Sequence, residues 1–77
     1  MNIKHESEYR QLGLKIAYDR KLRRLTQKQL AEKIDKSAAF IGHVEAPNVD
    51  KAISLDTLFD IAKALDIPAS KFLSFDD

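Results

Sequence analysis

The sequence predicts an all-α fold, a compact single domain of five short helices spanning residues 1–77. Gly and Pro occur only twice each, so few positions interrupt regular structure. Apolar residues recur at intervals of three and four, which is the spacing of an amphipathic helix. Ser or Thr stands directly before three of these stretches, where helices take their capping residues. With 77 residues, the chain has room for one small core.

The first helix is expected from about Ser7 to Lys21. One side of this stretch is apolar, so that side should face the core. The residues that mark it are Leu12, Ile16 and Leu22, with Tyr9 and Leu25 nearby.

The second helix is expected over about residues 27–34, directly after a capping signal. Thr26 is followed three positions later by Gln29, which is the pattern of a capping box. Ala31 is small, so the next helix can cross closely at that point. The apolar stripe of this helix consists of Leu30, Ala31 and Ile34.

A short turn separates the second helix from the third. Asp35 can adopt the left-handed conformation that ends a helix, less easily than Gly but better than most residues. Ser37 then caps a helix that runs from residue 38 through Glu45. Two short helices joined by about three residues form a helix-turn-helix, here over about residues 26–45. The inward-facing residues of the third helix are expected to be Ile41 and Val44.

Two further helices complete the domain. Ser54 caps a fourth helix over residues 55–65, and Pro68 is the expected first residue of a short fifth helix that ends near Leu73. The face of the fourth helix that should meet the core contains Leu55, Leu58, Phe59, Ala62 and Leu65.

Composition argues against several classes of function. Cys is absent, so neither a disulfide scaffold nor a thiolate zinc site is possible. His5 and His43 are far apart in sequence, and no Gly-rich phosphate loop or nucleophile motif occurs. No apolar run has the length of a membrane span, and no signal-peptide pattern begins the chain. We therefore expect a cytoplasmic protein that is not an enzyme, with no cofactor, no metal and no evident small-molecule ligand.

Charge is unevenly distributed along the chain. Residues 1–36 carry ten Lys and Arg against five Asp and Glu, whereas residues 37–77 carry three Lys against seven acids. A basic half suits contact with a polyanion such as DNA, although it is also compatible with an ordinary solvated helix face.

The stretch LTQKQLAEKI, together with the later S, FI and VE, resembles the phage-repressor family of helix-turn-helix proteins (Cro-like, often called XRE). The similarity continues through SLDTLFDIAKALDIPASKFL and covers about residues 12–73. It implies a lambda-repressor-like fold and a regulator that places its second motif helix in the major groove of double-stranded DNA. Such regulators are often homodimers on palindromic operators, and phage repressors and restriction–modification controllers are both examples.

The resemblance also implies roles for individual residues. Arg20 and Glu45 match a pair that ties the first helix to the end of the third, without contacting DNA directly. Residues matching base-reading positions, or lying between them, are Ala38, Ala39, Gly42 and His43. The candidates for phosphate contact are Gln27, Lys36, Asn48 and Lys51.

Direct readout of the bases is expected to be sparse. Alanine cannot hydrogen-bond a base, although its methyl group can contact that of thymine, so His43 is the main polar candidate. Specificity would then rest on His43, methyl contacts, dimer spacing and DNA shape. The chain also departs from the family pattern at two turns, where Arg24 and Asp35 occupy common glycine positions.

The C-terminal apolar residues have two interpretations. The residues are Phe72, Leu73 and Phe75. In one interpretation, Phe72 and Leu73 close the core. In the other, some of this apolar surface forms a two-fold dimer contact with the end of the fourth helix. An alternative function also stays open, that of an antitoxin or a regulator whose main partner is another protein.

Overall fold

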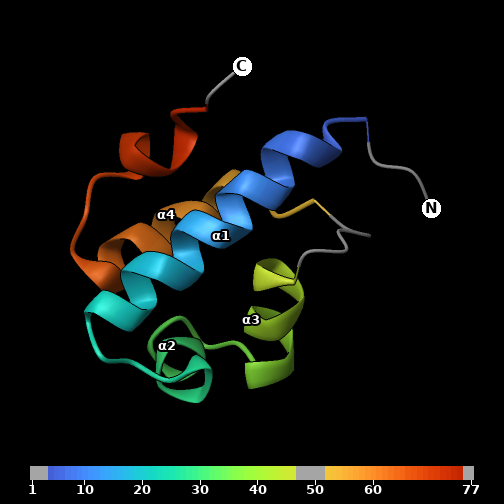
Figure 1. Cartoon of the computed structure of the whole chain (residues 1–77). Helices are drawn as coiled ribbons and strands as arrows, with labels where there is room; N and C mark the ends of the chain where they lie inside the picture. The colour runs from blue at the N-terminus through green and yellow to red at the C-terminus, as the bar shows by residue number, and fades with distance from the viewer. Residues whose placement is uncertain (1–3, 47–51, 76–77) are drawn as a thin grey trace.

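The structure is a computed structural model that describes residues 4–46 and 52–75. These residues form helices and connecting turns, with no strand among them, so the all-α class is confirmed. The elements are α1 (Glu6–Leu22), α2 (Gln27–Lys33), α3 (Ala38–Glu45), α4 (Leu55–Leu65) and the 3₁₀ helix η1 (Ala69–Leu73) (Figure 1).

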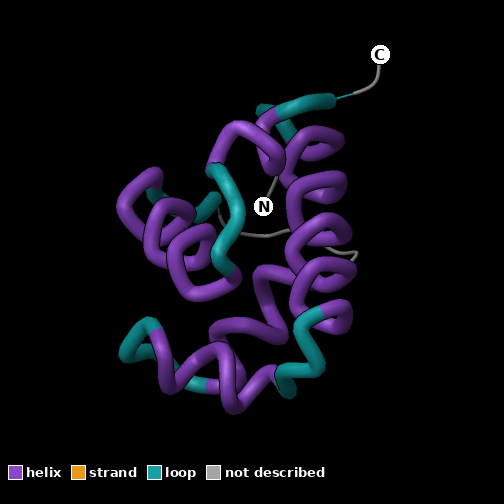
Figure 2. Tube along the Cα trace, turned by 90° about the vertical axis from the view of Figure 1, so that its left-hand side faces the viewer, coloured by secondary structure: helices purple, strands orange, loops and turns teal. Residues whose placement is uncertain are grey.

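Helices α1 and α4 enclose the core from two sides. In Figure 2, α1 stands upright at the right and α4 lies at the left, with α2 and α3 across the lower end and η1 at the upper end. None of the helices in the described parts of the chain is long and apolar enough to span a membrane. The fully buried large side chains at the centre are Ile16, Leu30, Ile41, Leu58, Ile61, Leu65 and Phe72.

Helix α1 extends one residue beyond the predicted range at each end. Leu12 and Ile16 are buried as expected, but Leu22 is 59% exposed, so its assignment to the apolar side was wrong. The buried side continues from Ile16 to Asp19 and Arg20, because these lie three and four positions further along.

The predicted caps of the next three helices are confirmed. Thr26 Oγ1 accepts a hydrogen bond from the Gln29 backbone N–H (3.0 Å), and Gln29 Oε1 accepts one from the Thr26 backbone N–H (2.8 Å), which completes the capping box. Ser37 and Ser54 each accept a hydrogen bond from the backbone N–H three residues later. These bonds satisfy backbone donors that the first turn of a helix leaves unpaired.

Three helices are followed, within two residues, by a non-glycine residue in the left-handed region. Asp35 has φ 59°, as predicted for the turn between α2 and α3, and Arg24 and Asp66 have φ 58° and 56°. At Asp35, the following backbone N–H, that of Lys36, donates to the Ala31 carbonyl (2.9 Å). Equivalent bonds follow Arg24 and Asp66, so hydrogen bonding offsets the conformational strain at all three helix ends.

Two predictions for the C-terminal part need correction. Leu55 and Phe59 are exposed, whereas Ile61 is fully buried, so the buried face of α4 is rotated from the predicted one. That face follows Leu58, Ile61 and Leu65, which belong to the hydrophobic core. Pro68 is the N-cap residue of η1, with extended ψ of 139°, and not its first helical residue.

Candidate nucleic-acid interface

Helix α3 presents one side to solvent and packs the other against the core. Ile41 has no exposed surface, whereas Ala38, Ala39 and His43 are exposed, and Gly42 between them is partly exposed. The segment is thus helical and uncovered, as a helix that enters DNA must be. All four residues predicted to face the bases lie on this helix.

A glycine in α1 allows α3 to approach closely. A Cβ atom placed on Gly13 would overlap the backbone carbonyl oxygen of Val44, which belongs to the last turn of α3. Only Gly therefore permits this crossing without a shift of backbone. Gly13 was not predicted to have this role, although an isolated glycine inside a helical pattern is a signal of close packing.

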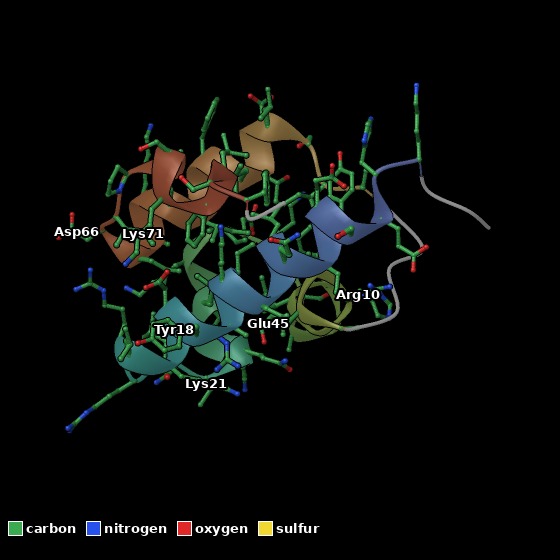
Figure 3. All side chains as sticks on the ribbon, turned by 45° about the horizontal axis from the view of Figure 1, so that its top comes forward. Arg10, Tyr18, Lys21, Glu45, Asp66 and Lys71 are labelled. Carbon is green, nitrogen blue, oxygen red and sulfur yellow. The ribbon has the colours of Figure 1, made fainter. Side chains whose placement is uncertain are left out.

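The pair expected between Arg20 and Glu45 forms in the structure. Arg20 Nε donates to Glu45 Oε2 (2.7 Å), and Arg20 Nη2 donates to Glu45 Oε1 (3.0 Å). Arg20 Nη1 also donates to the Leu25 backbone carbonyl (2.7 Å). The side chains are only 9% and 6% exposed, so this two-bonded ion pair joins α1 to the end of α3 largely out of water. In Figure 3, Glu45 lies where α1 passes α3.

Gln27, the predicted phosphate ligand on α2, belongs to the same cluster. Its Nε2 donates to Glu45 Oε1 (3.1 Å), and the side chain is partly buried. This contact between the start of α2 and the end of α3 was not expected from the sequence. No pattern in the sequence indicates this contact, because a turn separates the two residues and only the folded structure shows how that turn brings them together.

Of the other residues predicted to contact phosphate, the structure describes one. Lys36 is exposed, with its Nζ 5.4 Å from the centre of the Phe40 ring. Asn48 and Lys51 lie outside the described residues. Exposed basic residues are also present on α1 and α2, including Lys21 and Lys28. Figure 3 labels Lys21 and Tyr18, which are both exposed residues of α1.

The residues predicted to form a dimer contact differ in their exposure to solvent. Phe72 has no exposed surface and is part of the core, so its proposed role in a dimer contact is wrong. Leu73 is 46% exposed and Phe75 is partly exposed. The exposed apolar residues of α4 lie at its beginning and middle, Leu55 and Phe59, and not at its end as expected.

Leu73 and Leu55 lie beside one apolar cavity of about 250 Å³. It opens between the first turns of α1 and α4 and the segment after η1. Lys15 Nζ lies 4.9 Å from the centre of the Phe75 ring at this edge. The apolar residues that line the cavity include Tyr9, Leu12, Ile53, Leu58 and Phe75.

Comparison with known proteins matches this arrangement to a described family and fold. Residues 16–72 match the helix-turn-helix family. The structure is similar to the crystal structure of the restriction-modification controller protein C.AhdI from Aeromonas hydrophila, with a TM-score of 0.81 and 24% sequence identity. The match covers 91% of this chain and 99% of that one. Among curated protein sequences, no match was found.

Proposed function

The chain belongs to the helix-turn-helix family of the phage-repressor (Cro-like, XRE) type and is a DNA-binding transcriptional regulator, and on this premise we propose that it binds a palindromic operator as a homodimer. Each subunit places α3 in the major groove, and the two copies of α3 enter successive turns of that groove on one face of the DNA. The single observation that carries this proposal is the uncovered outer side of α3, on a helix fixed from behind by an ion pair and a close glycine crossing.

The dimensions of α3 suit the groove. Its eight residues span about 12 Å at about 1.5 Å per residue, comparable to a groove width of about 12 Å. His43 is the polar side chain that donates to a base edge, while Ala38 and Ala39 provide methyl contacts. Gly42 lets the helix backbone approach the DNA closely.

Phosphate contacts fix the position of the subunit on the duplex. Gln27 and Lys36 provide them from the described residues, together with Asn48 and Lys51, which follow α3 in the sequence. Such contacts carry no direct sequence information. The Gln27→Ala variant is therefore expected to weaken binding to all sequences alike, which titrations against several unrelated duplexes would measure. A changed base preference would contradict this placement of α2.

Two copies of the chain associate through exposed apolar residues, namely Leu55 and Leu73 beside the cavity and Phe59 on α4. Burying apolar surface of this kind stabilises association, and linking two weak half-sites raises the affinity for DNA. The Leu73→Glu variant should sediment as a monomer, because it places a charge in the contact. Leu14→Glu is the matched control, since Leu14 is 57% exposed on the outer side of α1. Monomers produced by the control alone would instead locate the contact on α1.

The regulated genes belong to a repressor circuit or a restriction–modification system. Support for the second comes from the controller protein C.AhdI, whose structure aligns over almost its full length. The neighbouring open reading frames would decide between them. A restriction enzyme beside the gene would indicate a restriction–modification system, and a phage lysogeny module would indicate a repressor circuit.

The salt dependence of binding tests the DNA function itself. Affinity for duplex DNA should fall steeply with salt, with a log–log slope of about −0.9 per neutralised phosphate. Weak binding that hardly responds to salt would favour the alternative of a regulator whose main partner is a protein.

A further inference from the structure

One oxygen of the Glu45 carboxylate connects the buried ion pair to Gln27, the residue proposed to contact a DNA phosphate. Glu45 Oε1 accepts from Arg20 Nη2 (3.0 Å) and from Gln27 Nε2 (3.1 Å). Since Glu45 is only 6% exposed, neither bond is readily replaced by a bond to water. The three residues come from α3, α1 and α2 respectively, so the ends of three helices meet at this oxygen.

This contact fixes which way the Gln27 carboxamide faces. An ionised carboxylate only accepts hydrogen bonds, so the group of Gln27 turned toward Glu45 must be the NH₂ and not the oxygen. Gln27 Oε1 then lies on the side of Gly42, 3.6 Å from the position of a Cβ atom on that residue. Within residues 4–46 and 52–75, Glu45 is the one hydrogen-bond acceptor assigned to Nε2. The second N–H of the group is therefore available to a ligand.

We propose that Glu45, held in turn by Arg20, is a positioning residue for DNA binding, because it keeps the second N–H of Gln27 directed to a phosphate oxygen. This inference rests on the proposed phosphate contact of Gln27. Without Glu45, the carboxamide is free to turn by about half a rotation and to present its oxygen, which a phosphate repels. The ion pair thus acts on affinity through Gln27 as well as on stability.

A double-mutant cycle tests this coupling. The first arm replaces the ion pair by apolar residues (Arg20→Met with Glu45→Leu), which removes the acceptor without leaving one buried charge unpaired. The second arm is Gln27→Ala, and affinity is measured on a mixed-sequence duplex at low salt. We expect the first arm to lower affinity about threefold to tenfold, the range of one hydrogen bond, and to have no effect once Gln27 is Ala.

A purely structural role gives a different result. The loss on replacing the ion pair would then be the same with Gln27 and with Ala at that position, and this would overturn the proposal. If Gln27→Ala alone left DNA affinity unchanged, Gln27 would not contact a phosphate. The inference, which rests on that contact, would then also be wrong. The matched control is Asp19→Asn, which removes a different buried carboxylate, paired with Lys71 (3.2 Å). Its effect on affinity should be small and equal in both backgrounds.

A measurement on the unaltered protein covers the case in which the apolar pair does not fold. Nuclear magnetic resonance resolves the two side-chain amide protons of Gln27. One should exchange with water more slowly than those of Gln11, which lies on α1 and bonds Ser7 Oγ at 3.3 Å. The other should shift on addition of the duplex. Fast exchange of both protons in the free protein, as at an exposed glutamine, would overturn the proposal.

Discussion

The two sides of α3 differ in how much they contact the rest of the molecule. On the inner side, Ile41 is fully buried, Val44 abuts Gly13 and Glu45 is bonded to two other helices. On the outer side, Ala38, Ala39 and His43 are exposed. The inner side therefore governs where the helix stands, and the outer side governs what it contacts.

This difference predicts that stability and DNA recognition can be altered separately. Substitutions on the inner side should change the free energy of unfolding first, and affinity only as a consequence. Those on the outer side should change affinity while leaving unfolding nearly unchanged, because surface substitutions usually stay within about 0.5 kcal/mol. The residues at the boundary, Gln27 and Gly42, are where the two properties meet.

The largest effect is expected for Arg20→Ala. It leaves the Glu45 carboxylate buried without its partner, which should lower the free energy of unfolding by about 3–5 kcal/mol. Urea denaturation followed by circular dichroism would measure this. A loss below about 1 kcal/mol, the value of an exposed ion pair, would contradict the buried character of the pair.

Gly13→Ala should follow, although alanine is the better helix former. The added methyl group meets the Val44 backbone carbonyl, so α1 and α3 must move apart, with an expected loss of about 1–3 kcal/mol of stability. Thermal unfolding of the variant beside the parent chain would show it. An increase in melting temperature would mean that the crossing is looser than the structure has it.

His43→Ala is expected to act on recognition alone. It should lose about 1–3 kcal/mol of discrimination at one base position, if His43 donates to a base edge as proposed. Selection of sites from a random DNA pool measures the preference before and after the change. An identical set of selected sites would remove His43 from the base contacts.

Gly42→Ala should give the smallest change in stability, and in the opposite direction. A methyl group there meets only the Gln27 side chain at ordinary contact distance, so the gain in helix propensity should add about 0.5–1 kcal/mol. The melting temperature should rise while DNA affinity falls, since the added group separates α3 from the duplex. A variant with higher stability and unchanged affinity would show that close approach at Gly42 is not needed.

The sequence predicted the local features of the fold better than the contacts between its parts. Caps at Thr26, Ser37 and Ser54 and the turn at Asp35 depend on neighbouring residues, so they could be identified from short patterns. The exposed positions of Leu22 and Phe59 could not, because the angle at which a helix meets the core depends on elements distant in sequence. Periodicity marks an apolar face only to within a residue or two.

The candidate site shows the same division. The Arg20–Glu45 pair was expected through the family resemblance, and the outer residues of α3 followed from the helical period. The bond from Gln27 to Glu45 and the contact of Gly13 with Val44 were missed, because both depend on how three helices cross. For a related reason, Phe72 was given two interpretations, because an apolar residue of this kind is equally suited to a core and to an interface.

The affinity of Ala39→Glu for duplex DNA tests most directly whether the outer side of α3 enters the groove. Ala39 is exposed, so the variant should unfold at nearly the parent temperature, and Ser70→Glu on η1 provides a control of equal charge. We predict that Ala39→Glu lowers affinity at least about tenfold more than Ser70→Glu, because the new carboxylate faces the phosphates and base edges. Equal affinities for the two variants would show that α3 does not contact DNA.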